Sequence, residues 1–370
     1  MTRQKITVLA VAAAVLLAAG IGLNVYRANQ HSTQAGERVF PDLTAALGDV
    51  EEIRISRGDG SRTTLRRTAN GWEVVERNYP ADPARVRDLA LALANLKIVE
   101  RKTSDPANYS KLGVETPDTP IATSTLVEVV AGEKSWPLIV GKSAENRAVY
   151  VRKPAEAASA LAEPSLSVDP DQKRWIDRLL TDINGAQLHD ISVKPAIGPA
   201  YLLTRAKPGE DLTLSPIPKG RAAASTLSTD AQGEALASFN FDDVRAAPAP
   251  APAPTDRATF RTFDGQVIEF AGRREGEKAY VTVAARRGDA LAAQFPASTE
   301  PATAAPATSE KSPSPAAPAP AANPAAKSVE QLNARTAGVE YEIPIYKYDS
   351  IFKAQEDLLE KRPEKTAAKK

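Results

Sequence analysis

The longest apolar stretch of the chain lies near its N-terminus, from Ile6 to Val25. No charged residue interrupts it, and about 20 apolar residues is the length of an α-helix that crosses a bilayer core. Arg3 and Lys5 precede the stretch, so its short N-terminal side is predicted to stay in the cytoplasm. We therefore expect a cytoplasmic tail, a transmembrane anchor and a juxtamembrane segment at residues 1–5, 6–26 and 27–48.

A cleaved signal peptide is the main alternative for this segment. Its apolar region is usually shorter, about 7–15 residues, and small residues mark the cleavage site. The residues after Val25 are Tyr-Arg-Ala-Asn-Gln, which fit such a site poorly. The pattern favours an uncleaved anchor in the inner membrane that carries a periplasmic body.

The body begins with the alternating pattern of half-buried strands and continues with an amphipathic helix. Ile53 and Ile55 alternate with polar residues. Asp82 and Pro83 suit a helix N-cap and first helical position, and apolar residues at helical spacing follow them. Gly113 is expected to end a short helical turn. Further strands are expected at 63–67, 71–76, 98–99, 126–130, 136–140 and 149–152, with turns at Gly132 and Gly141.

The same order of elements recurs after residue 188. Strand patterns lie at 191–193, 201–204 and 212–214, a helical stretch ends at 235–239, and strands follow at 259–263, 267–270 and 280–283. Gly265 and Gly272 take the places of Gly132 and Gly141 as expected turns. The sequence therefore predicts an internal duplication, with repeats at 49–168 and 188–362.

Residues 169–187 are predicted as a connecting helix. Asp169 and Pro170 suit its start, and an apolar side follows, formed by Trp175, Ile176, Leu179 and Leu180. Near the C-terminus, 341–348 is predicted as an aromatic-rich strand and a helix is expected from Asp349. The predicted fold class is α+β, with an N-terminal transmembrane helix followed by two tandem antiparallel sheet-plus-helix repeats.

Two Ala/Pro-rich segments interrupt the second repeat, at 246–254 and 296–327. They carry few large apolar side chains, so burial cannot offset the entropy of ordering them, and they are predicted not to fold. We interpret them as loop insertions, with a spacer or wall-spanning stalk as the alternative. Residues 363–370 form a basic tail.

Composition excludes several classes of protein. The net charge is +1, whereas a nucleic-acid surface requires a clustered basic excess. The absence of cysteine excludes disulfides, thiolate catalysis and cysteine metal sites. Hydrophobic residues make up 42% of the chain, which is enough for the cores of about two domains.

The histidines offer little catalytic chemistry. His31 follows the predicted anchor, and His189 begins a predicted strand beside Asp190. Adjacent strand residues point to opposite faces, so we expect this pair not to act as a general base.

Two pairs of neighbouring carboxylates could support acid–base chemistry, Glu51-Glu52 and Asp242-Asp243. Such chemistry requires groups that face each other across a cleft, and both pairs are expected to be solvated beside strands. We predict no catalytic, cofactor-binding or metal-binding residue.

Glycine-rich and tryptophan-containing segments have structural interpretations. Gly58-Asp59-Gly60 and Ile139-Val140-Gly141-Lys142 lack the remaining residues of a phosphate loop and are interpreted as turns. Trp72, Trp136 and Trp175 could line a sugar-binding face, but their amphipathic elements favour core packing.

Several motifs together resemble a known family. They are Leu96 to Thr103, Asn108 to Val114, Ile139 to Lys142, Phe241 to Val244, Tyr341 to Pro344 and Tyr346-Lys347. In these motifs, and over nearly the whole body, the chain is similar to the uncharacterised bacterial group called domain of unknown function 4340. The resemblance implies one N-terminal membrane helix and an accessory role beside ABC-type export systems of the gliding-motility kind. It implies no catalytic residues.

We therefore expect an extracytoplasmic accessory or scaffold protein of such an export complex, and not an enzyme. Its expected partners are the inner membrane and membrane proteins of that complex, without nucleic acid and without a cofactor. The sequence does not identify a small-molecule ligand. A binding module for envelope polysaccharide or cell wall, and a carboxylate-dependent hydrolase, are the alternatives.

Overall fold

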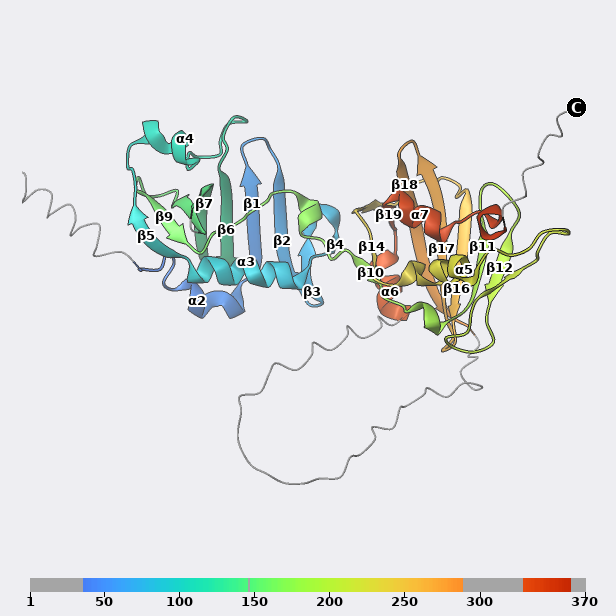
Figure 1. Cartoon of the computed structure of the whole chain (residues 1–370). Helices are drawn as coiled ribbons and strands as arrows, with labels where there is room; N and C mark the ends of the chain where they lie inside the picture. Colours follow the sequence, from blue (N-terminus) through green and yellow to red (C-terminus); the bar gives the residue numbers. More distant parts are fainter. Residues whose placement is uncertain (1–35, 146, 289–328, 361–370) are drawn as a thin grey trace, which may run out of the picture. The chain divides into compact units, whose positions relative to one another are not determined.

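The computed structural model describes residues 36–145, 147–288 and 329–360 (Figure 1). They belong to two compact units that divide between Asp177 and Arg178. Both units are built mainly from antiparallel sheet with a few helices, as the predicted α+β class requires.

The predicted anchor at 6–26, the tail at 1–5, His31, the segment 296–327 and the tail 363–370 lie outside the described residues. Within 36–145, 147–288 and 329–360, no helix has the length and apolarity needed to span a membrane.

The first unit contains a nine-stranded sheet. In spatial order its strands are β4 (Tyr79–Pro80), β3 (Gly71–Val74), β2 (Arg62–Thr68), β1 (Glu52–Arg57), β6 (Thr125–Ala131), β7 (Lys134–Ala144), β8 (Ala148–Arg152), β9 (Ser159–Glu163) and β5 (Lys97–Arg101). Its helices are α2 (Leu43–Ala46), α3 (Pro83–Asn95) and α4 (Tyr109–Leu112), with short 3-10 turns at η1 (Leu47–Asp49), η2 (Val75–Arg77), η3 (Pro106–Asn108) and η4 (Gln172–Arg174).

Helix α3 forms as the sequence predicts. The Asp82 side chain accepts hydrogen bonds from the backbone N–H groups of Ala84 and Arg85, and Pro83 is the first helical residue. Val86, Leu89 and Leu93 are buried along one side of the helix. The core face of the sheet includes Ile53, Leu65, Val74, Val127 and Leu138, all at most 1% exposed.

The opposite, outer face of the first sheet is covered by residues 102–124, which we call the cover loop. Tyr109 and Val114 from this loop form a small buried cluster with Ile139 of β7. Gly113 ends α4 in the left-handed conformation (φ 68°), as predicted.

Gly141 was predicted as a turn, and this prediction is wrong. It lies inside β7 at an irregularity in the pairing with β8, between Val140 and Ser143. A Cβ at this position would lie 2.5 Å from the Leu112 carbonyl oxygen. Glycine is needed here because the cover loop approaches the strand backbone closely.

The second unit contains an eight-stranded sheet. Its strands, in spatial order, are β13 (Thr213–Ser215), β12 (Tyr201–Thr204), β11 (Leu188–Lys194), β16 (Asp256–Thr262), β17 (Gln266–Glu275), β18 (Lys278–Arg287), β19 (Val339–Ile343) and β15 (Asp243–Ala246). β10 (Leu179–Thr181) and β14 (Phe239–Asn240) form a separate pair. The helices are α5 (Thr226–Gly233), α6 (Val329–Thr336) and α7 (Ile345–Ile351), with 3-10 turns at η5 (Gly185–Gln187), η6 (Glu234–Leu236) and η8 (Gln355–Leu358).

Helices cover the apolar face of this sheet, where α5 and α7 lie against the strands (Figure 1). Aromatic rings fill the space beneath them: Phe270 contacts Phe239 and Phe260 edge to face, with ring centroids 5.5 and 5.8 Å apart. Gly272 faces this core, and a Cβ there would lie 2.5 Å from the Phe352 ring. Gly272 is therefore a strand residue of β17, and its lack of a side chain lets the segment after α7 pack closely against the strand. The turn predicted at Gly272 is wrong, because the chain turns at Gly276 (φ 62°).

The predicted connecting helix at 169–187 is also wrong. Only η4 is helical before Trp175, and Leu179–Thr181 is the strand β10. Backbone bonds to distant segments replace the helical ones: the N–H of Asp82 donates to Trp175, and the N–H of Asp177 donates to Pro80. Tertiary pairing outweighs the helical spacing of the apolar residues, most of which are buried in these extended positions.

The C-terminal elements differ in their boundaries from the predicted ones. β19 ends at Ile343, and Pro344 is the N-cap residue of α7, which begins at Ile345 rather than at Asp349. The predicted strand 341–348 is therefore too long, because Pro cannot donate a ladder hydrogen bond and suits a helix start. Within the first Ala/Pro-rich segment, predicted at 246–254, Ala246 is the last residue of β15, and residues 247–254 contain neither helix nor strand. Strand β9 and helix α6 were not predicted.

We predict that Gly141→Ala destabilises the first unit by about 1–3 kcal/mol, because the added Cβ collides with the cover loop. Gly48→Ala is the matched control, since nothing lies within 4 Å of its Cβ position. Urea unfolding followed by tryptophan fluorescence measures the effect selectively, because all three tryptophans lie in the first unit. Equal midpoints for the two variants would contradict the close approach.

Candidate functional site

The second sheet carries a continuous polar surface on the face opposite its helices, which we call the outer face. Antiparallel register sets its composition, because directly paired residues point to the same side. Arg245 pairs with Glu340, and Tyr280 pairs with both Glu342 and Arg273. Strands β15, β19, β18 and β17 thus place these five side chains on one surface.

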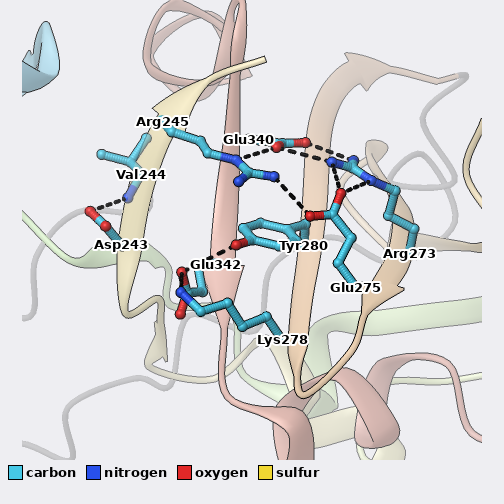
Figure 2. A network of polar contacts seen from close by, with 9 residues as sticks. All are labelled: Asp243, Val244, Arg245, Arg273, Glu275, Lys278, Tyr280, Glu340 and Glu342. Carbon is cyan, nitrogen blue, oxygen red and sulfur yellow. Dashed lines mark hydrogen bonds and ion pairs between the residues drawn. The ribbon is translucent and has the colours of Figure 1, made fainter. Parts of the chain in front are cut away.

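A buried carboxylate lies at the centre of this surface. Glu340 is 1% exposed and accepts hydrogen bonds from two arginines (Figure 2). Arg245 Nε lies 2.5 Å from Glu340 Oε1, and Arg273 Nη1 lies 2.7 Å from Glu340 Oε2. Removing a carboxylate from water is unfavourable unless charged donors satisfy both of its oxygens, and here they do.

A second acid and an aromatic ring complete the cluster. Glu275 accepts hydrogen bonds from Arg273 Nε at 2.9 Å and from Arg245 Nη2 at 3.3 Å. The Arg245 guanidinium carbon lies 3.8 Å from the centroid of the Tyr280 ring, at cation–π distance. Tyr280 is 4% exposed beneath it. We call Arg245, Arg273, Glu275, Tyr280 and Glu340 the arginine cluster.

Protonation equilibria reflect these contacts. The hydrogen bond to Glu340 raises the pKa of Arg273 above its ordinary range. Burial alone would lower the pKa of Arg245, but the bond to Glu340 outweighs it and the pKa is raised. The bond from Arg273 lowers the pKa of Glu275, and the bond to Glu342 raises the pKa of Lys278. These four groups, Arg245, Arg273, Glu275 and Lys278, are thus held more firmly in their charged forms.

At the other end of the outer face, His189 and Asp190 are in contact, and the prediction that they point apart is wrong. His189 Nδ1 lies 2.6 Å from Asp190 Oδ2. The reason is a register shift between Leu188 and Asp190 in the pairing with β16, which removes the alternation of faces at this point. Arg261 Nε lies 2.9 Å from the same Asp190 oxygen, so the carboxylate is shared between a cation and the imidazole.

This trio does not form a hydrolytic site of the serine-protease type. Asp190 is 4% exposed and tied to Arg261, and the His189 ring packs edge to face against Phe263 at 5.2 Å. The His189 ring therefore packs against the core and helps to fix the irregular part of β11 between Leu188 and Asp190.

The acid pairs are held by arginines. Glu52 Oε1 lies 2.5 Å from Arg54 Nε, and Glu52 Oε2 lies 3.2 Å from Arg66 Nε, on the outer face of the first sheet. Asp242 Oδ1 lies 2.8 Å from Arg178 Nη2. The Asp242 side chain stays 46% exposed, in keeping with the expected solvation, whereas the Glu52 side chain is only 15% exposed between its two arginines.

The three tryptophans occupy core positions. Trp136 and Trp175 are 5% and 6% exposed, and Trp72 is half-buried on the same face of β3 as the buried Val74. The predicted core packing is confirmed for Trp136 and Trp175. Among the residues that the structure describes, no group of three or more His, Cys, Asp or Glu is arranged to hold a metal ion.

Two of the motifs that carry the family resemblance meet in the cover loop of the first unit. Lys142 Nζ donates to the Ser110 and Lys111 carbonyls, at 3.2 and 3.1 Å, and so closes the C-terminal end of α4. Arg152 is 6% exposed, stacks on Tyr109 at 4.5 Å and donates from Nε to the Val114 carbonyl at 2.9 Å. The motif residues attach a loop to a sheet and form no reactive constellation.

The fold and these surfaces define an α+β protein of two antiparallel-sheet units, with charged outer faces held in ion-pair networks. A family model described as a domain of unknown function (DUF4340) matches residues 72–258, half of the chain. The chain belongs to this family, which confirms the resemblance found in the motifs. The matched region begins in β3 of the first unit and ends in β16 of the second. No curated protein and no solved structure matches the chain.

The arginine cluster was not predicted from the sequence. The alternation in Val339-Glu340-Tyr341-Glu342-Ile343 places both acids on one face, and this signal was available. The two arginines that meet Glu340 are 67 and 95 residues away from it, and only the register of four strands brings them together.

We predict that Glu340→Ala lowers the stability of the β15–β19 region by about 3–5 kcal/mol, because it removes the one buried carboxylate between Arg245 and Arg273 and leaves them only the half-exposed Glu275. Glu269→Ala, which removes an exposed partner of Arg286, should cost no more than about 1 kcal/mol. Amide hydrogen exchange of peptides from β15 and β19 measures both. Equal losses of protection would contradict the central role of Glu340.

A second prediction concerns pH. Burial alone would raise the pKa of Glu52, but the bonds from Arg54 and Arg66 outweigh it, and the pKa lies below the ordinary 4.5. The stabilisation is therefore present above about pH 4.5 and is lost as the pH falls through the lower folded-state pKa. The urea midpoint of the first unit, followed by tryptophan fluorescence, should fall on acidification, and Glu52→Gln should flatten this dependence. An unchanged slope in the variant would refute the assignment.

Proposed function

We propose that this chain is a single-pass, membrane-anchored, extracytoplasmic accessory or scaffold protein of a bacterial ABC-type export complex. It acts by binding and not by catalysis. The outer face of the second sheet is the surface that contacts a membrane-protein partner. The observation that carries this proposal is the arginine cluster, which presents charged groups in fixed positions on a broad sheet face.

Several features support a binding role for this face. Arg245 and Glu275 keep 41% and 44% of their side-chain surface exposed although both are held by ion pairs. Arg261, Glu269 and Arg286 extend the exposed charged surface across β16, β17 and β18. Arginine and tyrosine are enriched at the energetically dominant positions of protein interfaces, and held side chains lose less entropy on binding.

The location rests on the N-terminal sequence and on the family. The apolar run at 6–26 has the length of a bilayer-spanning helix, and the charge before it favours a cytoplasmic N-terminus. The resemblance to proteins encoded beside gliding-motility-type export systems supplies the kind of partner. An envelope polysaccharide is the alternative occupant of the same face.

We also propose that the two units arose by duplication. The first sheet contains the order β3-β2-β1-β6-β7-β8-β9-β5, and the second has the order β13-β12-β11-β16-β17-β18-β19-β15. The strands correspond one to one along the chain. Under this correspondence, the cover loop of the first unit matches the short segment 247–255 of the second.

Site-specific photo-crosslinking in intact cells tests the partner surface. A photoreactive residue at Thr282, on the outer face of β18, should crosslink to a membrane subunit of an export complex that mass spectrometry identifies. The control position is Ala231, which is exposed on α5 against the opposite face of the sheet.

The interpretation predicts a crosslink at Thr282 that Glu275→Arg reduces several-fold by reversing one charge of the arginine cluster. Crosslinks at Ala231 alone would move the partner to the helical face. Release of crosslinked material by glycan-degrading enzymes would favour the polysaccharide alternative.

A further inference from the structure

The chain enters the first unit along the free edge of β5. Gly36 N–H donates to the Ile98 carbonyl at 2.7 Å, Ile98 N–H donates to the Glu37 carbonyl at 2.8 Å, and Arg38 and Lys97 form an antiparallel bridge. Residues 36–38 therefore extend the sheet by a short segment beside β5. This contact fixes where the chain that follows the proposed anchor meets the folded body.

The direction of this pairing indicates where the chain comes from. Because it is antiparallel, moving backward from Arg38 to Gly36 means moving forward along β5, from Lys97 toward Arg101. Nine residues, 27–35, separate the proposed anchor at 6–26 from Gly36, and they can span at most about 30 Å. The Arg101 end of β5 therefore lies within reach of the bilayer that holds the anchor.

A hollow of about 380 Å³ lies at this end of β5, beside α4. We call it the β5–α4 hollow. Three of its lining residues are cations and one is an acid; the lining is formed by Glu100, Arg101, Lys102, Thr103, Asn108, Lys111 and Leu112. The lining thus has a formal excess of two positive charges.

The contacts of Lys102 and Lys111 can be exchanged for contacts with a ligand. Lys102 Nζ lies 2.6 Å from Glu100 Oε2, but the Glu100 side chain is 52% exposed, and exposed ion pairs contribute little. Lys111 Nζ donates to the neutral Asn108 Oδ1 at 2.7 Å. Ammonium and guanidinium groups are the usual ligands of phosphate oxygens in proteins, and arginine can bind them in a bidentate manner.

We propose that the β5–α4 hollow binds the headgroup phosphates of anionic phospholipids in the bilayer that holds the anchor. This proposal rests on the proposed membrane anchor. Headgroup binding at Arg101, Lys102 and Lys111 orients the first unit on the membrane surface, since the chain enters this unit next to the same site.

The test uses the full chain in lipid nanodiscs, made either with zwitterionic lipid alone or with added phosphatidylglycerol. The chain contains no cysteine, so Ser110→Cys on α4 accepts a single fluorescent label, and Ser192→Cys on β11 provides a label in the other unit. A quencher attached to lipid headgroups reports contact with the membrane surface. We expect strong quenching at Ser110→Cys that depends on phosphatidylglycerol, whereas the label at Ser192→Cys reports separately whether the second unit contacts the membrane.

Removing the charges of Arg101, Lys102 and Lys111 tests whether these side chains bind the headgroups. Combining R101Q, K102Q and K111Q should lower the contact equilibrium constant by roughly fivefold for each charge removed. A control that combines K194Q, K207Q and R257Q removes the same charge from exposed positions of the second unit and should leave quenching unchanged.

The outcomes separate the two proposals. A chain that enters no nanodisc of either composition would refute the anchor itself. A chain that enters both, with equal quenching in each or equal quenching in the two triple variants, would overturn the headgroup site and leave the anchor intact. Loss of quenching on addition of millimolar inorganic phosphate at constant ionic strength would assign the hollow to free phosphate instead.

Discussion

Each unit depends on one long-range strand pairing. β1 pairs with β6, and β11 pairs with β16, although 67 residues separate Arg57 from Thr125 and 61 separate Lys194 from Asp256. This antiparallel pairing joins the opening hairpin to the later meander and fixes which side chains of every following strand face the helices. A slip by one residue would send the apolar residues of β16, β17 and β18 to the outer face.

Once the register is fixed, both sheets have buried groups on their outer faces, and the two units cover or pair these groups in different ways. In the first unit the cover loop shields Ile139, and the buried Arg152 donates to backbone carbonyls of that loop and of the segment after β8. In the second unit the connection between β15 and β16 is short, and the buried Glu340 is satisfied by two arginines of the same face. Part of the first outer face is therefore covered by the cover loop. The second outer face keeps its charged groups at the surface. This difference is the reason for placing the partner on the second sheet.

Much of the fold could be predicted from the sequence, because local signals and packing agree. Asp82 and Pro83 define the start of α3, Gly113 ends α4, and period-two alternation marks most strands. Predictions failed where a distant contact decided the conformation. The predicted helix ends at Trp175, after the turn η4, because the backbone of Pro80 and Asp82 binds that of Asp177 and Trp175 and Ile176 forms a β-bridge with Ala81. Gly141 and Gly272 resemble turn residues in sequence, but they are strand residues against which other segments pack closely.

The candidate site could be predicted only in part for the same reason. The alternation in β19 could have indicated acids on one face, although the predicted strand 341–348 left Glu340 out. Nothing local could indicate the arginines opposite them, because β15, β17 and β19 meet only in the folded sheet. The contact between His189 and Asp190 depends on a strand irregularity that has no composition signal. Predicting a charge network on a sheet face thus requires knowledge of the strand register, whereas helix caps and turns can be recognised from the local sequence.

The central claim is that a membrane-bound chain presents both units outside the cytoplasm. Protease digestion of spheroplasts, combined with alkaline extraction of their membranes, tests it most directly. The account predicts that the full chain stays with the extracted membranes and that external protease degrades its body without lysis. Recovery of the intact chain in the soluble fraction, or a body that external protease reaches only after the inner membrane is broken, would contradict it.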